Sequence, residues 1–124
     1  MIEIFYEYGS ERDSGEAEMR GYRVDIYVKV NNLYYNIVAY NLIRLVQDFN
    51  IEIKENGIYV QEPNLILVEN VTTNEIINVI KNLYEYDYFK FLKGVEEKDI
   101  NQLGFYRRFE DDKTLTVKDL HKIY

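Results

Sequence analysis

Apolar and polar residues alternate along most of the first 40 residues, which is the pattern of β-strands with one buried face. Residues 2–8, 22–30 and 33–40 each show this period of two. Asn31 and Asn32 separate the last two segments, and because Asn tolerates a positive φ they predict a tight turn. We therefore predict a strand followed by an antiparallel hairpin.

The second of these strands carries the clearest alternation in the chain. Its apolar residues, Val24 among them, occupy every other position from Tyr22 to Val30. Arg23 and Asp25 fall between them. The pattern predicts that Val24 is buried and that Arg23 and Asp25 face water.

A helical period follows the hairpin. Asn41 is placed to cap a short helix, whose apolar positions at i, i+3, i+4 and i+7 are Leu42, Leu45, Val46 and Phe49. Ile51 and Ile53 then predict a further extended segment. Asn56-Gly57 is a strong hairpin signal, with another short apolar segment after it.

The middle of the chain predicts one more strand and one more helix. Leu65–Val68 is a continuous apolar run, typical of a central strand that is covered on both faces. Thr72 and Glu75 have the spacing of a capping box at the start of a helix. The apolar stripe of this helix is Ile76, Ile80, Leu83 and Tyr84, and aromatic residues continue from it to Gly94.

The remaining segments complete the predicted architecture. Residues 95–103 and 116–124 suggest short helices, and residues 105–109 suggest a strand. Residues 9–21 lack periodicity and are rich in acids, so we predict a flexible acidic loop there. The element order predicts one α+β domain over residues 1–124: a mostly antiparallel β-sheet with two or three short helices packed on one face.

Composition then narrows the classes of function. Fifteen Lys and Arg against 22 Asp and Glu give a net charge of −7, which argues against a direct nucleic-acid ligand because phosphate binding needs clustered basic residues. No apolar run approaches the roughly 20 residues of a membrane span. The N-terminus lacks a basic region before its apolar residues, so no signal peptide is expected. We expect a cytoplasmic protein.

Catalytic signatures are weak in this sequence. The chain has no cysteine and a single histidine, His121. Asp119 lies two positions away from it, a spacing at which two helical side chains do not face each other. No glycine-rich phosphate loop, nucleophile elbow or metal-binding histidine pair is present. We therefore expect a protein that is not an enzyme, with no metal and no cofactor.

Tyrosine is the unusual component, with 13 Tyr and no Trp. Tyr84, Tyr86 and Tyr88 follow one another at a spacing of two, so on a helix their rings cannot all point into the core. Tyr also has a high β-propensity and fills half-buried strand positions, which explains many of the others. Because Tyr is enriched at protein interfaces, at least one displayed aromatic patch is expected.

The acids cluster in three short segments: residues 11–18, 96–99 and 110–112. Solubility alone accounts for such clusters, since solvated faces are charged. They also speed association with a basic protein through long-range electrostatic steering. The acidic clusters therefore favour a basic protein as partner.

Three segments together resemble a bacterial family, the immunity proteins of polymorphic toxin systems and in particular the family of immunity protein eight. They are Tyr34–Leu42, the run Leu65–Val68 leading into Ile76–Leu83, and Leu103–Asp111. The resemblance implies a cytoplasmic protein that neutralises a cognate toxin by stoichiometric binding.

The resulting hypothesis is a non-catalytic immunity or inhibitor protein that binds a toxin or another basic protein. Its candidate contacts are central tyrosine anchors with acids at the rim: Tyr86, Tyr88, Tyr106, Glu110, Asp111 and Asp112. One alternative is a phage or mobile-element inhibitor that mimics nucleic acid. Another is a homodimeric structural or regulatory domain in which the tyrosine patch pairs with itself. The sequence leaves monomer and homodimer open.

Overall fold

The computed structural model describes residues 2–7, 14–96, 100, 106–109 and 114–115. In chain order its elements are β1 (Ile2–Glu7), α1 (Ser14–Arg20), β2 (Tyr22–Val30), β3 (Leu33–Tyr40), α2 (Leu42–Asn56), β4 (Leu65–Leu67), α3 (Thr73–Glu85), the 3-10 helix η1 (Tyr88–Phe91), β5 (Gly94–Val95), β6 (Tyr106–Arg108) and β7 (Thr114–Leu115).

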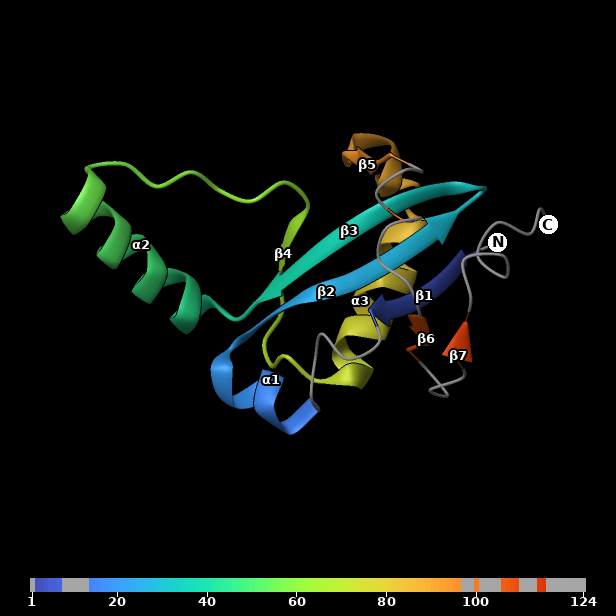
Figure 1. Cartoon of the computed structure of the whole chain (residues 1–124), viewed down its shortest axis with the longest axis horizontal. Coiled ribbons are helices and arrows are strands. Elements are labelled where there is room, and N and C mark those ends of the chain that lie inside the picture. Colours follow the sequence, from blue (N-terminus) through green and yellow to red (C-terminus); the bar gives the residue numbers. More distant parts are fainter. Residues whose placement is uncertain (1, 8–13, 97–99, 101–105, 110–113, 116–124) are drawn as a thin grey trace.

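These strands form one sheet in the order β4-β3-β2-β1-β6-β7, and β5 pairs with β3 outside this path. Only β3 and β4 run parallel among the described strand pairs. Figure 1 shows α3 crossing one face of the sheet, while α2 stands away from it. The predicted α+β class with a mostly antiparallel sheet is confirmed.

The central hairpin of β2 and β3 follows the predicted turn. Asn31 and Asn32 both adopt positive φ angles, 48° and 69°, which an Asn-Asn pair tolerates better than most residues. The pairing register shifts between Arg23 and Ile26. This shift is a β-bulge, and it changes which side chains of β2 are buried.

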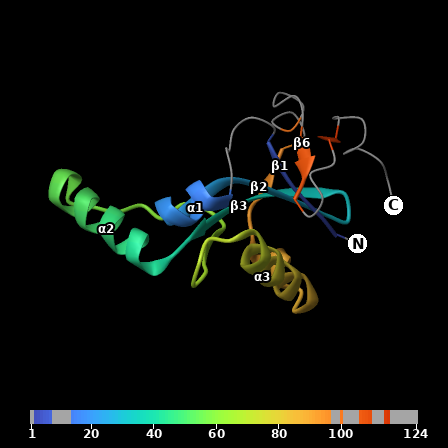
Figure 2. The same ribbon diagram turned by 90° about the horizontal axis from the view of Figure 1, so that it is seen from below.

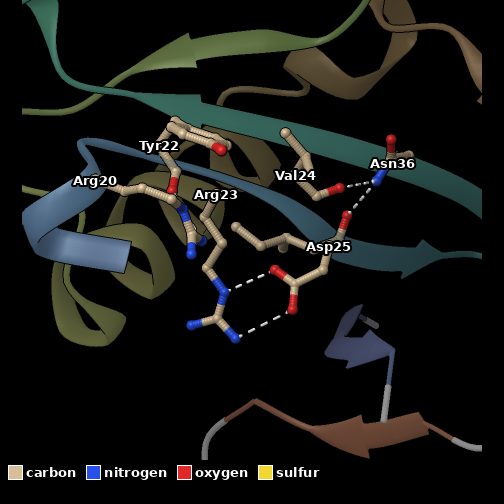
Figure 3. Close-up of polar contacts among 7 residues, drawn as sticks. Arg20, Tyr22, Arg23, Val24, Asp25 and Asn36 are labelled. Carbon is tan, nitrogen blue, oxygen red and sulfur yellow. Dashed lines mark hydrogen bonds and ion pairs between the residues drawn. The ribbon is translucent and has the colours of Figure 1, made fainter. Parts of the chain in front are cut away.

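Arg23 and Asp25 are buried, and Val24 is half exposed, so the predicted assignment of faces at the start of β2 was wrong. Figure 3 shows the two charged side chains on the same side of β2, reaching each other. The Asn36 amide of β3 donates to the carbonyls of Val24 and Ile26, at 3.0 and 2.9 Å. These bonds bridge the bulge.

Both faces of the sheet are covered. The main core lies under α3 and includes Ile26 and Ile37 of the sheet with Ile76 and Ile80 of the helix. A second, smaller cluster on the other face joins buried Phe5, Tyr34 and Ile100. Tyr34 lies opposite the apolar residues of the predicted strand 33–40, so the alternation predicts a displayed ring, but the ring is buried in this cluster.

Helix α1 replaces part of the predicted acidic loop. Residues 14–20 are helical rather than irregular, Ala17 is fully buried, and residues 9–13 lie outside the described residues. Gly21 ends the helix with φ 80°, and its amide donates to the Ala17 carbonyl at 2.9 Å. Seven residues are too few for a helical period to stand out in the sequence.

Helix α2 is twice as long as the predicted helix segment because Ile51 and Ile53 continue it. The predicted extended segment and hairpin turn there were wrong. Asn41 caps its start by accepting the Arg44 amide at 2.8 Å, as predicted. Gly57 caps its end with φ 73°. A glycine after an apolar helical stripe is also a typical helix stop, and here the helical reading prevails over the hairpin reading.

We call α2 and the returning segment 57–64 the arm. Figures 1 and 2 show the arm extending from one end of the sheet, with the C-terminal end of α2 farthest from the body. No residue of α2 is buried. The helix therefore departs from the expected packing on one face of the sheet. None of the described helices is long and apolar enough to cross a membrane.

The second strand–helix unit is only partly as predicted. Strand β4 covers Leu65–Leu67 of the run Leu65–Val68 and pairs with β3 alone, so it lies at the end of the sheet order and is not a central strand. Thr72 caps α3 by accepting the Glu75 amide at 3.3 Å. The Glu75 carboxylate accepts from the Asn70 amide at 2.6 Å. The capping box is therefore half formed.

The last described elements are short. Helix α3 ends at Glu85, and η1 follows before β5. Val95 is in β5 rather than in the predicted helix over 95–103, whereas Ile100 within that range is helical. Strand β6 confirms a strand within residues 105–109 and pairs with β1. The closing helix predicted over 116–124 falls outside the described residues.

Candidate functional site

The structure describes only part of the contact set predicted from the sequence. Tyr86 directly follows α3 and is 80% exposed, and Tyr88 begins η1 and is about half exposed. The Tyr88 ring meets the exposed Phe91 ring edge-on, with centroids 5.4 Å apart. The expected displayed aromatic patch is therefore present.

The other predicted contacts are not joined to this patch by any described contact. Tyr106 lies on β6, where it pairs with Glu7 and Leu115, and its side chain is outside what the structure describes. Glu110, Asp111 and Asp112 also lie outside the described residues. Their part in a binding site stays a prediction.

A groove of about 550 Å³ lies between α2 and the returning segment of the arm. We call it the acidic groove. Its polar lining comes from the end of β3, from α2 and from the returning segment: Tyr40, Asp48, Glu52, Asn56, Tyr59 and Glu62. The groove thus brings three carboxylates and two phenols to one open concave surface.

The pKa of Tyr40 is raised by burial and by the neighbouring carboxylate of Asp48. Burial, a hydrogen bond from the phenol to Asp48 and the negative charge of Asp48 raise the pKa of Tyr40 to about 12, against a smaller opposing effect of Arg44. Each of the first three effects disfavours a phenolate. Tyr40 therefore acts in the groove as a neutral hydrogen-bond donor whose proton is already shared with a carboxylate.

Tyr59 lies on the opposite wall of the groove, and the pKa of its phenol is also raised. Burial raises its pKa first, followed by the negative charges of Asp48, Glu62 and Glu52. The Tyr59 ring also meets the Phe49 ring of α2, with centroids 6.0 Å apart. This aromatic contact and the charge of Asp48, which raises both pKa values, link the returning segment to the helix across the groove.

A stack of rings and guanidinium groups fixes the base of the arm. Tyr40 stacks on Tyr22 with centroids 5.5 Å apart. Arg20 and Arg44 lie over the Tyr22 ring, with their Cζ atoms 4.8 and 4.7 Å from its centroid. Arg44 also pairs with Asp48 at 3.0 Å. The sheet and α1 thereby position the first turns of α2, where the groove begins.

The chain also approaches itself closely at this point. The Asn41 amide donates to the Gly21 carbonyl at 2.9 Å. A Cβ atom on Gly21 would lie 2.9 Å from the Cβ of Arg44, which leaves no room for a side chain. Gly21 thus allows the end of α1 to dock against the start of α2.

The chemistry available in the acidic groove is that of a cation receptor. Its carboxylates accept hydrogen bonds, and the faces of Tyr40 and Tyr59 suit a cationic group. Among the described residues, no three or more His, Cys, Asp or Glu side chains are grouped so that they could hold a metal ion. A lysine or arginine side chain fits this lining better than a bare metal ion does.

A second groove, of about 410 Å³, lies beside β4 and β5 and includes Asn36, Glu62, Lys93 and Glu96. Asn64 also lines this groove: its side-chain amide donates to the Lys93 carbonyl at 2.7 Å, and its side-chain oxygen accepts from the Lys93 amide at 2.7 Å. These bonds tie β5 to the turn before β4. Because the lining carries both signs of charge, this groove lacks the one-sided field of the acidic groove.

Sequence reasoning missed the acidic groove because it divided α2 in the wrong place. Asp48 and Glu52 are four residues apart, so on a continuous helix they share a face. With residues 51–60 read as extended, this relationship is lost.

A scan of models of known families found no match to this chain, and searches of curated proteins and of solved structures found none either.

Proposed function

We propose that this protein is a non-catalytic binding protein of the immunity or inhibitor type, which neutralises a basic partner protein by stoichiometric binding. We propose further that the acidic groove receives a lysine or arginine side chain of that partner. The observation that supports this is the convergence of Asp48, Glu52 and Glu62 with Tyr40 and Tyr59 on one open surface.

The groove suits such an anchor physically. Charge-assisted hydrogen bonds to a carboxylate are about twice as strong as neutral ones. A cation over a tyrosine ring adds about 0.5–2 kcal/mol, depending on its desolvation. An arginine that enters the groove would gain both kinds of contact, while the net charge of −7 would steer a basic protein toward it.

The exposed patch at Tyr86 and Tyr88 is a second candidate contact for the same partner. Its rings would supply apolar area around a charged anchor, as tyrosines do in other interfaces. The described contacts do not connect it with the acidic groove. Separate substitutions in the two regions therefore test them independently.

A basic peptide tests the groove directly. Isothermal titration with a tetra-arginine amide should give saturable binding that weakens as salt rises. The variant with Asp48→Asn, Glu52→Gln and Glu62→Gln should bind this peptide at least about tenfold more weakly. A tetra-glutamate peptide should not bind.

A matched variant separates the groove from net charge. Glu55, Glu69 and Glu85 are exposed and do not line the groove, so replacing all three with Gln removes the same charge elsewhere. Binding of tetra-arginine should change by less than about threefold in this control. Equal losses in both variants would show that only net charge matters and would overturn the assignment to the groove.

The biological part of the proposal needs the natural partner. The product of the adjacent open reading frame is the first candidate, and it should inhibit growth when expressed alone. Co-expression of this protein should restore growth and yield a stoichiometric complex. If the groove variant restores growth as well as the unmodified chain, the groove does not carry the neutralising contact.

A further inference from the structure

Helix α2 is built as a stable helix, but its apolar side is largely exposed, with the Tyr59 ring meeting Phe49 there. Both ends are capped, by Asn41 and Gly57, yet none of its 15 residues is buried. A helix of this length is marginal in water unless its apolar face is covered. The described part of the chain leaves that face open.

The open face is a regular stripe along the helix. Leu42, Val46, Phe49 and Ile53 are 61%, 47%, 46% and 41% exposed. Their spacings of four, three and four residues are the d-a-d-a pattern of a helix that packs on another helix. We call these four residues the α2 stripe. The two a positions are Val46 and Ile53, so every position of the stripe is apolar.

The positions next to the α2 stripe carry little charge. They are Ile43, Leu45, Asn50 and Glu52, so only one of the four is ionised. The other charged residues of α2 lie farther round the helix. The stripe can therefore meet an identical stripe without placing carboxylates against each other.

We propose that the α2 stripe pairs with the α2 stripe of a second copy of this chain, and that the two helices run antiparallel. In this arrangement Leu42 packs against Ile53 of the second copy, and Val46 packs against Phe49 of the second copy. Each layer thus combines one β-branched residue with one residue that is unbranched at Cβ. The interface is its own complement under a two-fold axis, as in most homodimers.

The direction of the arm favours the antiparallel arrangement. In Figures 1 and 2, α2 runs away from the sheet and ends far from the body. An antiparallel pair places the two bodies at opposite ends of the joined helices. A parallel pair would bring both bodies to the same end, where two chains of charge −7 repel each other.

The area matches a weak, reversible dimer. The four stripe residues and Ile43 each expose on the order of 100 Å² of apolar surface, so the pair buries roughly 1,000 Å² in total, near the lower limit for a specific interface. We expect a dissociation constant on the order of 10 μM. Higher salt should leave the dimer unchanged or strengthen it, because it screens repulsion between the two chains.

This inference does not depend on the proposed function. The α2 stripe adjoins the acidic groove through Phe49, whose ring meets Tyr59, but none of the four stripe residues lines the groove. Higher salt should weaken binding of a basic peptide and should not weaken the dimer. Binding of a basic peptide can fail while the dimer forms, and the reverse also holds. The two proposals are therefore tested separately.

Sedimentation equilibrium of the full chain tests the dimer. The mass should rise from monomer to dimer between about 1 and 500 μM. Val46→Glu should weaken dimerisation at least about 50-fold, since it places a charge in the centre of the stripe. Gln47→Glu adds the same charge one position away, outside the stripe, and should change the dissociation constant less than about threefold.

Two results would overturn the proposal. One is a chain that remains monomeric up to about 500 μM. The other is equal weakening by Val46→Glu and Gln47→Glu, which would place the contact outside the stripe. Circular dichroism of both variants confirms that the sheet is intact, and because α2 buries no residue we expect no loss of the fold.

Disulfide trapping tests the orientation, and the absence of native cysteine makes it specific. The Val46→Cys chain and the Phe49→Cys chain are mixed and oxidised. Antiparallel packing places these two positions opposite each other, so the mixed disulfide should dominate over both symmetric ones at least about fivefold. Predominant symmetric disulfides would show parallel helices and overturn the antiparallel pair.

Discussion

Arg23 and Asp25 form a buried ion pair, with Nε of Arg23 2.8 Å from Oδ1 of Asp25 and both side chains 5% exposed. The Arg23 guanidinium also lies over two rings, with its Cζ 5.1 Å from the Tyr6 centroid and 4.6 Å from the Phe109 centroid. Phe109 follows β6, and its amide donates to the Ile4 carbonyl at 2.8 Å. The ion pair therefore helps to hold the C-terminal strands against β1 and β2.

Removal of one partner of this ion pair should destabilise the folded state. Asp25→Ala leaves a buried guanidinium without its counter-ion and should lower the free energy of unfolding by about 3–5 kcal/mol. Replacement of both partners, Arg23→Met with Asp25→Leu, should cost less, because no uncompensated charge remains. Urea denaturation measures both.

The exposed pair of Lys90 and Asp87 is the control for this prediction. Its atoms are 3.6 Å apart, and its side chains are 59% and 81% exposed. Lys90→Ala should change stability by no more than about 1 kcal/mol. Comparable losses for Asp25→Ala and Lys90→Ala would show that burial of the first pair has no energetic consequence.

Two glycines at helix ends should respond differently to alanine. Both have positive φ, 80° at Gly21 and 73° at Gly57, so alanine costs about 1–2 kcal/mol of backbone strain at each. A Cβ at Gly57 meets nothing within 4 Å, whereas at Gly21 it lies 2.9 Å from the Cβ of Arg44. Gly21→Ala should therefore lower the melting temperature more than Gly57→Ala, and the opposite order would contradict the close docking of α1 on α2.

The pKa of Tyr40, raised to about 12 from 10.0, predicts a loss of stability in alkali. Between these two values the unfolded chain has released the Tyr40 proton and the folded chain retains it, so stability falls as pH rises from 10 to 12. Tyr40→Phe should flatten this slope. Asp48→Asn should flatten it in part, because it removes the hydrogen-bonded charge.

Difference spectroscopy checks the same assignment. Tyrosinate absorbance, compared between the unmodified chain and Tyr40→Phe, should show that the phenol lost from the variant ionises near pH 12. Tyr86→Phe is the control, since Tyr86 is 80% exposed. If Tyr40→Phe removes a phenol that titrates near pH 10, neither the burial of Tyr40 nor its interaction with Asp48 raises the pKa as assigned.

The local elements were readable from the sequence wherever one physical signal dominated. The strands around Asn31 and Asn32, the cap at Asn41 and the cap at Thr72 all follow from short-range rules and are confirmed. The bulge in β2 could not be predicted from the sequence of β2, because a register shift depends on the hydrogen-bond partners that the neighbouring strand provides. Here the Asn36 side chain bonds to two carbonyls of β2.

The acidic groove could not be predicted from the sequence because two local signals compete at one point of the chain. Asn56-Gly57 suits a hairpin turn and also the end of a helix, and the β-branched Ile51 and Ile53 favour strands in isolation. In the structure Ile53 extends the α2 stripe. A single wrong choice there separated Asp48 and Glu52 from Tyr59 and Glu62, so the groove could not be assembled from the sequence.

Two valines provide a final test of the open arm. Val28 is fully buried in the sheet, whereas Val46 in α2 is 47% exposed. Val28→Ala should cost about 2 kcal/mol through lost contacts and a cavity. Val46→Ala, measured at low micromolar concentration where the chain is monomeric, should be neutral or stabilising by about 0.5 kcal/mol, because alanine has the higher helix propensity. Thermal unfolding measures both, and an equal loss for the two substitutions would mean that the chain itself covers the α2 stripe.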